Sequence, residues 1–153
     1  MVWGAFCGKL KSELFFVPNG AKVDSPKYVQ HILDPLLIPF WHRTCEEYGW
    51  TAVMEDGAPG HKKFAITCRE RNEVETLKWP AQSPDLNAIE SLWGDTECEL
   101  AHIYGRITNL ALMEEALKTA WMNITVERLD GLIRSMPERL QAVINVNGYA
   151  TPF

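Results

Sequence analysis

Two patterns of hydrophobic and polar residues alternate along the chain, and each predicts a different kind of element. Residues 1–6 and 12–18 are rich in aromatic and β-branched side chains and are separated by Cys-Gly-Lys-Leu-Lys. This pattern is typical of two strands joined by a turn, so we predict a hairpin at the start of the sequence. Short apolar runs at residues 50–55 and 74–79 predict two further strands.

Longer stretches carry apolar residues at helical spacing. The first runs from Ser25, the expected N-cap, through Pro26 at the first helical position to Gly49 as the stop. Pro35 and Pro39 are expected to kink or split it. Further helices are predicted at residues 62–72, 88–104, 109–124, 125–136 and 137–148. This order predicts an α/β fold with a mixed sheet flanked by helices and a helical C-terminal tail.

Composition narrows the class of protein. With 153 residues and 46% hydrophobic residues, the chain can form one folded domain, which we expect to cover residues 1–153. The formal net charge of −5 argues against binding nucleic acid through a general basic surface. Contact with phosphates therefore needs a local basic patch or bridging metal ions.

Cysteine usage and hydropathy bear on location. The four cysteines form no Cys-x-x-Cys pair, and no signal peptide is recognised, so we expect reduced thiols in a nuclear or cytoplasmic protein that is not secreted. The apolar stretch at residues 32–41 contains an Asp and two prolines and is too short to span a bilayer. We therefore expect no membrane partner.

Two acidic residues stand where predicted strands end. Asp56 follows the strand at 50–55, and Glu90 opens the helix that comes after the strand at 74–79. In open α/β sheets, ligands collect at the carboxyl ends of strands. Two carboxylates that converge there repel each other unless a cation lies between them. Magnesium binds a few carboxylates together with water and phosphate oxygens, and paired ions of this kind serve phosphodiester chemistry.

Simpler structural roles account for the same residues. Asn87 to Glu90 matches a capping box, in which the glutamate only bonds the first amides of its helix. Asp56 before Gly57 can equally be a turn residue. A lone histidine such as His61 is more often a surface residue than a metal ligand. The residues by themselves leave both readings open.

Two longer motifs favour the metal site. The stretches MEDGAPGHKK and LKWPAQSPDLNAIESLWG resemble the catalytic domain of mariner-type transposases of the DDE superfamily. The family's second acid stands in a motif like Q-D-N-A-P-x-H, which Asp56 to His61 resembles with Gly57 in place of Asn. Its third acid ends the motif S-P-D-L-N-P-I-E, and here that acid is Glu90, 34 positions after Asp56 (90 minus 56). Ala88 replaces the proline of that motif.

The resemblance covers essentially the whole chain, with residues 1–6 similar to the family's second core strand and residues 135–148 to its C-terminal helix. It implies a ribonuclease-H-like fold and metal-dependent DNA cleavage and strand transfer. Asp56 and Glu90 are the implied catalytic residues and ligands of Mg²⁺ or Mn²⁺. DNA, as transposon ends and target, is the implied partner, and a homo-oligomer is possible in the intact family.

Two neighbouring residues have weaker claims on this site. His61 is expected to lie beside it. Asp85 belongs to the second motif but precedes the helix, and we interpret it as an acid that stabilises the loop rather than as a ligand.

The sequence also departs from the family. The first catalytic aspartate belongs to the strand before the one that residues 1–6 resemble, and no residue here matches it. We therefore expect a partial catalytic domain without the first, central strand, and a chain that does not cut DNA alone. Residues 94–100 are acidic where the family is basic, which argues against DNA contact by that helix. The alternative function is a non-catalytic relic or recruited domain that binds nucleic acid or protein.

Overall fold

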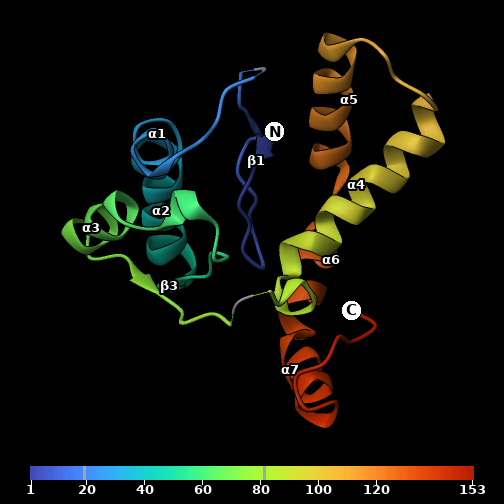
Figure 1. The fold of residues 1–153 in the computed structure, drawn as a ribbon. Coiled ribbons are helices and arrows are strands. Elements are labelled where there is room, and N and C mark those ends of the chain that lie inside the picture. Colours follow the sequence, from blue (N-terminus) through green and yellow to red (C-terminus); the bar gives the residue numbers. More distant parts are fainter. Residues whose placement is uncertain (19, 81) are drawn as a thin grey trace. The chain divides into compact units, whose positions relative to one another are not determined.

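Contacts between residues divide the chain into two compact units. The computed structural model describes residues 1–18, 20–80 and 82–153 (Figure 1). Unit 1 comprises Met1–Ala5 and Phe15–Gln82, and unit 2 comprises Phe6–Leu14 and Ser83–Phe153. One domain over residues 1–153 therefore stays a prediction. Ala81, within the second motif, lies outside the described residues.

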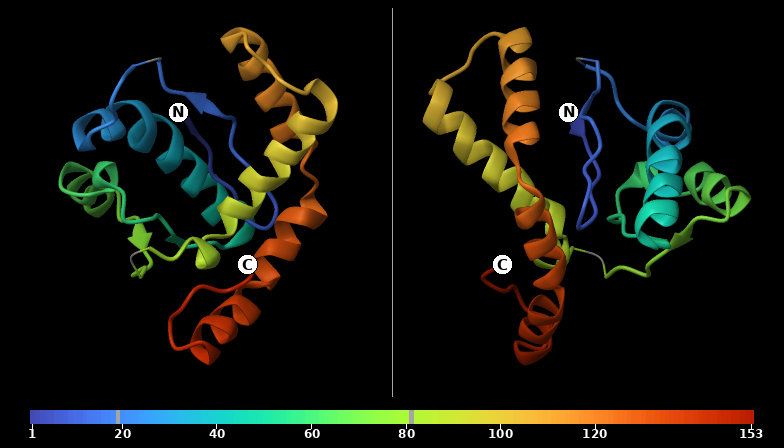
Figure 2. Two further views of the ribbon diagram at one scale, coloured as in Figure 1. Left: turned by 45° about the vertical axis from the view of Figure 1, so that its right-hand side comes forward. Right: turned by 180° about the vertical axis from the view of Figure 1, so that it is seen from behind.

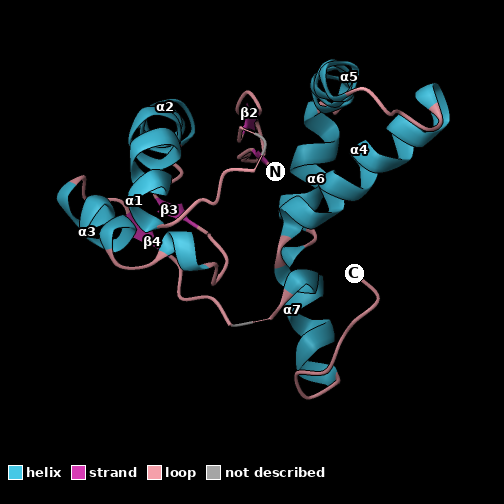
Figure 3. Cartoon of the chain, turned by 45° about the horizontal axis from the view of Figure 1, so that its top comes forward, coloured by secondary structure: helices cyan, strands magenta, loops and turns pink. Residues whose placement is uncertain are grey.

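Unit 1 contains two small sheets. β1 (Val2–Trp3) pairs antiparallel with β2 (Phe15–Phe16), which confirms the predicted hairpin. β3 (Ala52–Val53) pairs parallel with β4 (Glu75–Thr76), so the two later strands also form, although they are shorter than predicted (Figure 3). Within the described part of the chain no strand joins the two sheets. The predicted strands therefore form one antiparallel pair and one parallel pair, in two separate sheets instead of one mixed sheet.

The first helical stretch consists of α1 (Ser25–Tyr28), a π-helical segment η1 (Val29–Leu37) and α2 (Ile38–Tyr48). Pro35 lies inside η1, where the Ile38 amide donates to the Leu33 carbonyl five residues back. This wider turn accommodates a proline that lacks an amide hydrogen, so the stretch continues through the predicted break.

The start of this stretch corrects one prediction. The N-cap is Asp24 rather than Ser25, because the Asp24 backbone is extended and its carboxylate accepts from the Lys27 amide at 3.1 Å. Ser25 is instead the first helical residue. Its hydroxyl donates to the Lys62 carbonyl and accepts from the Ala65 amide at 3.1 Å. Ser25 therefore connects α1 to α3 (Phe64–Arg71).

The core of unit 1 forms on the apolar face predicted for this stretch. Ala65 of α3 and Val74, which precedes β4, complete it, and Trp3 and Phe15 of the hairpin pack against it. Burial of each large apolar side chain contributes about 1.5–3 kcal/mol relative to exposure. The buried residues from the helical stretch are Tyr28, Ile32, Leu33, Leu37 and Ile38.

Unit 2 is helical. A short 3-10 turn, η3 (Pro84–Leu86), leads into α4 (Ala88–Tyr104), whose bounds are those predicted. α4 and α5 lie side by side (Figure 2). No helix in the described ranges is long and apolar enough to cross a membrane. The remaining helices are α5 (Leu110–Asn123), α6 (Val126–Arg134) and α7 (Met136–Asn145). Their ends lie slightly inside those predicted, except that α7 begins one residue earlier than expected.

The core of unit 2 centres on Trp121, which is 1% exposed and stacks on Trp93 with ring centroids 5.0 Å apart. The Trp121 indole nitrogen donates to the Ser12 carbonyl at 2.7 Å. Phe6 and Leu14 pack against the same cluster, so the tip of the hairpin is part of this core. The other buried members are Ala88, Leu92, Leu129 and Leu132.

Candidate metal-binding site

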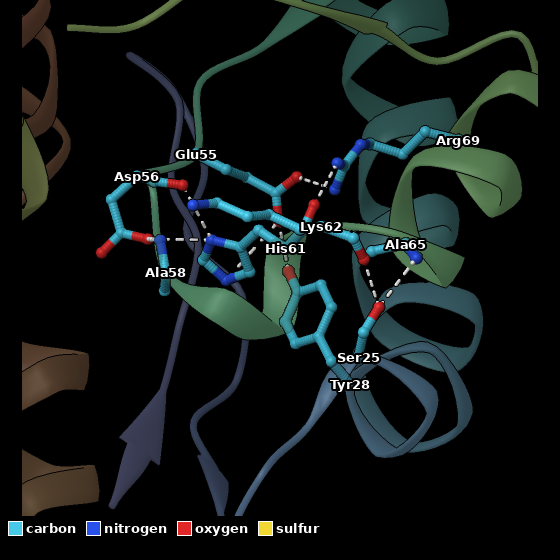
Figure 4. A network of polar contacts seen from close by, with 9 residues as sticks. All are labelled: Ser25, Tyr28, Glu55, Asp56, Ala58, His61, Lys62, Ala65 and Arg69. Atoms are coloured by element: carbon cyan, nitrogen blue, oxygen red, sulfur yellow. Dashed lines mark hydrogen bonds and ion pairs between the residues drawn. The ribbon is translucent and has the colours of Figure 1, made fainter. Parts of the chain in front are cut away.

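Asp56 lies just beyond β3, at the start of the loop that leads to η2 (Pro59–His61). Its Oδ1 accepts from the Ala58 amide at 3.0 Å and from His61 Nδ1 at 2.8 Å. Its Oδ2 has no partner among the described residues and points away from the loop (Figure 4). The side chain is 54% exposed. The turn role and the ligand role are therefore compatible, because each uses a different oxygen.

His61 lies beside Asp56, as expected from the resemblance. Its Nδ1 is 2.8 Å from Asp56 Oδ1 and 3.1 Å from the Asp56 carbonyl oxygen, so both nearby groups are acceptors and Nδ1 carries the proton. Its Nε2 is 3.8 Å from Glu55 Oε1, and its ring packs against Tyr28 with centroids 4.6 Å apart. His61 thus orients the acid through Nδ1.

Sequence reasoning missed a buried network behind this loop. Glu55 Oε2 accepts from Arg69 Nη1 at 2.5 Å, and Glu55 Oε1 accepts from the Tyr28 hydroxyl. Burial, followed by the charge and hydrogen bond of Glu55, raises the pKa of Tyr28, so its hydroxyl stays protonated and donates. One signal was available: Arg69 follows Ala65 by four residues and so shares the buried face of α3. A charged residue on such a face needs a partner.

Glu90 lies in the first turn of α4, in unit 2, and is exposed. The capping box is not formed, so that structural role for Glu90 is wrong. Asn87 stands at the N-cap position but makes no side-chain cap bond. Its Nδ2 donates to Glu90 Oε1 at 3.4 Å, and its buried Oδ1 has no partner in the described part of the chain. Asn87 therefore does not cap the helix by itself either.

The chain's path through η3 accounts for the failed cap. The Asn87 amide donates back to the Pro84 carbonyl at 2.9 Å, which continues the 3-10 turn up to the start of α4. With Asn87 held at φ −84° and ψ 93°, its side chain lies along the Glu90 side chain instead of over the free amides. The Glu90 carboxylate is left with one long contact and keeps Oε2 free of partners in the residues described.

Asp85 makes the loop contacts that its interpretation requires. Its Oδ2 accepts from the Thr151 hydroxyl at 2.9 Å, and its carbonyl accepts from Arg139 Nη1 at 2.8 Å. Arg139 is 4% exposed and also donates through Nη2 to the Ser91 hydroxyl at 2.8 Å. These bonds fix the motif loop to α4, α7 and the C-terminal residues. The structure therefore supports a stabilising role for Asp85.

The acidic surface of α4 is partly compensated. Asp95 forms a two-point ion pair with Arg128 of α6, at 2.7 and 3.1 Å, and Glu99 accepts from the Asn123 amide nitrogen at 2.6 Å. The repulsion of phosphate predicted for this helix is therefore weaker than the count of its acids indicates.

The donor set fits a hard divalent cation. Asp56 and Glu90 each offer a carboxylate oxygen, the ligand type that Mg²⁺ and Mn²⁺ prefer. In the described ranges, no three His, Cys, Asp or Glu side chains are grouped so that they could hold a metal ion. Because the two acids belong to different units, each described by itself, their meeting at one site stays a prediction.

Comparison with known proteins shows that the sequence is similar to transposases. No protein-family model matches the chain. The Tc1 transposase of Caenorhabditis elegans is 35% identical over 154 residues, which cover 100% of this chain and 54% of the relative. The Tcb1 transposase of Caenorhabditis briggsae is 32% identical over 155 residues, with the same shares. The Tc3 transposase of C. elegans is 32% identical over 97% of this chain and 44% of its own length. The chain thus spans about half the length of the curated relatives it matches.

Solved structures share the fold. The Mos1 transposase catalytic domain with raltegravir and manganese superposes with a TM-score of 0.76 at 19% identity, covering 99% of this chain and 82% of that one. The same domain with raltegravir and magnesium gives a TM-score of 0.81 at 17% identity, covering 98% and 76%. The mixed α/β fold is therefore that of a ribonuclease-H-like transposase catalytic domain. Over essentially its full length the chain is a homologue of the Tc1, Tcb1 and Tc3 transposases, and it has the fold of the Mos1 transposase catalytic domain.

Proposed function

We propose that this chain supplies two metal ligands, Asp56 and Glu90, to the catalytic domain of a DNA transposase. The proposed cofactor is Mg²⁺ or Mn²⁺, and the proposed activity of the intact protein is DNA cleavage and strand transfer. One observation carries the proposal: Asp56 is fixed through Oδ1, while its Oδ2 stays exposed and free of partners in the described residues. A residue that served only the turn would not require that second oxygen.

Each residue has a definite task in this proposal. Asp56 binds through a single oxygen, because its other oxygen is held by Ala58 and His61. Glu90 offers its carboxylate from the first turn of α4, at the N-terminus of that helix. Divalent ions held there would supply charge stabilisation to the attacking and leaving oxygens of a phosphodiester.

The 153-residue chain by itself is expected to bind DNA weakly and not to cut it. It carries two of the three acids of the family's motif, and loss of one group from an electrostatic clamp typically costs orders of magnitude in rate. We also propose a nuclear location, because a transposase acts where its DNA lies. Self-association into a homo-oligomer is a further part of the proposal. A gel-filtration measurement of mass addresses the second point.

The test is metal-dependent DNA binding by the whole chain. Because the net charge is −5, we expect little binding of a labelled duplex without metal and a clear increase in fluorescence anisotropy when Mn²⁺ is added. Asp56→Asn should remove most of the increase, whereas Asp34→Asn, at an exposed position in η1, should preserve it. DNA binding that does not depend on Mn²⁺, or that is unchanged in Asp56→Asn, contradicts the proposal and favours the non-catalytic binding module.

The same samples test the expected lack of cleavage. Denaturing gels should show no Mn²⁺-dependent product above background. A product that disappears in Glu90→Gln would mean that a third acid within this chain completes the site, with Asp24 and Asp85 as the first residues to replace.

A further inference from the structure

One guanidinium group closes the loop that carries Asp56. Arg69, on α3, donates through Nη1 to Glu55 at the start of the loop, at 2.5 Å, and through Nη2 to the His61 carbonyl at its end, at 2.6 Å. The planar fork of arginine suits this pair of bonds, because two parallel donors reach two acceptors in fixed directions. Figure 4 shows both bonds leaving the same end of the side chain.

Within the loop that Arg69 closes, further hydrogen bonds involve Glu55 and Asp56. Tyr28 donates to the other oxygen of Glu55, and His61 donates from Nδ1 to Asp56 Oδ1 at 2.8 Å. Exposure rises along the path, from 8% for the Arg69 side chain and 11% for Glu55 to 20% for His61 and 54% for Asp56. The buried Arg69 guanidinium is therefore connected to the exposed Asp56 carboxylate through His61, whose carbonyl bonds Arg69 and whose ring bonds Asp56.

We propose that Arg69 is a positioning residue, which holds His61 and Glu55 so that Asp56 presents only Oδ2 to a divalent cation. The inference rests on the proposed function, and it adds residues that no motif match supplies. Glu55 is the acid nearest to Asp56 in sequence, but both its oxygens are engaged by Arg69 and Tyr28. Glu55 therefore supports the site and does not bind the metal.

Fold stability alone is a weak reason for such a network. A buried ion pair often contributes no more than well-packed apolar residues of similar volume, because desolvation offsets the attraction. Groups that hold a metal ligand in place, in contrast, typically change metal affinity by about 10–100-fold when they are replaced. Orientation of Asp56 is the task that a fixed, bidentate arginine performs better than an apolar side chain.

The experiment compares Arg69→Lys with a matched control, Arg43→Lys. Arg43 pairs with Glu47 on the surface of α2, where its side chain is 60% exposed. Lysine keeps the positive charge but cannot make both bonds in fixed directions. Free Mn²⁺ measured by electron paramagnetic resonance gives the affinity. The ring ¹⁵N spectrum of His61, recorded without metal, reports whether Nδ1 still carries its proton.

We expect Arg69→Lys to weaken Mn²⁺ binding by about tenfold or more and to lose the protonated Nδ1 signal of His61. Arg43→Lys should leave both readouts unchanged. A folded Arg69→Lys with wild-type affinity and an unchanged His61 spectrum overturns the inference and leaves the proposed function standing. Wild type that binds no Mn²⁺ through Asp56 overturns the proposed function instead, and the His61 spectrum then decides whether Arg69 positions Asp56.

A second pair of variants covers the case in which Arg69→Lys does not fold. Glu55→Gln retains an acceptor for Arg69 and a partner for Tyr28, whereas Glu55→Ala removes both. The inference predicts near wild-type behaviour of His61 in the Gln variant and loss of its Nδ1 proton signal in the Ala variant. Equal spectra for the two variants overturn it.

Discussion

At the scale of single residues, backbone conformation decides what a glycine contributes. Gly49 ends α2 at φ 71°, in the left-handed region, and the next amide, that of Trp50, donates back to the Thr44 carbonyl at 3.3 Å. Gly57, which replaces the asparagine of the family motif, has no positive φ, and a Cβ added there meets no atom within 4 Å. The first glycine is required by its turn, and the second is not.

Two alanine substitutions separate these cases. Gly49→Ala should lower the free energy of unfolding by about 1 kcal/mol, because a Cβ is disfavoured at positive φ. Gly57→Ala should leave it unchanged or raise it by about 0.4–1 kcal/mol, because it restricts the unfolded chain. Urea unfolding followed by circular dichroism measures both. A loss of similar size at the two positions would contradict this assignment.

At the scale of elements, the sequence predicts what depends on local pattern and misses what depends on distant partners. The helix at 88–104 matches because its apolar spacing and its stop at Gly105 are local features. The start of α1 is off by one residue, because Ser25 and Asp24 are both good caps and the Ser25 hydroxyl instead bonds the Lys62 carbonyl, 37 positions away. Strand lengths fail for the same reason, since pairing decides them.

The cap assignment leads to a prediction at this scale. Asp24→Ala should cost about 1 kcal/mol of stability through the lost cap. Ser25→Ala should cost more, because the buried Ala65 amide and the Lys62 carbonyl both lose their partner, at about 1–3 kcal/mol for an unsatisfied buried group. Denaturant titration of both variants gives the comparison. If Asp24→Ala has no effect, Ser25 is the cap and the observed start of α1 is wrong.

At the scale of the whole molecule, the sequence supplies the family and the two acids, while the supporting contacts come only from the fold. Arg69 bonds Glu55, 14 positions away, and Arg139 bonds Asp85, 54 positions away. Neither contact can be predicted from the spacing of residues within one helix or strand. The apolar cores were more predictable, since burial follows the helical stripe. Trp121 is the exception, because its indole nitrogen depends on Ser12, 109 positions away.

Trp121 gives a test of how much this core matters. Trp121→Ala should cost about 3–5 kcal/mol, the range for removing a buried aromatic side chain. Trp50→Ala, at a position 38% exposed in unit 1, should cost much less. Guanidinium unfolding monitored by far-ultraviolet circular dichroism distinguishes them. Equal losses would mean that the cluster around Trp121 is not the main core of unit 2.

The central claim is that Asp56 and Glu90 bind the same divalent ions, and a double-mutant cycle of Mn²⁺ affinity tests it most directly. Isothermal calorimetry would compare wild type, Asp56→Asn, Glu90→Gln and the double variant, with Asp34→Asn, at an exposed position in η1, as the control. If the acids share a site, each single substitution should lose nearly all of the weak wild-type binding, and the double variant should lose little more. Asp34→Asn should bind as wild type does. Losses that simply add, or Mn²⁺ binding unchanged by either substitution, would contradict a shared metal site.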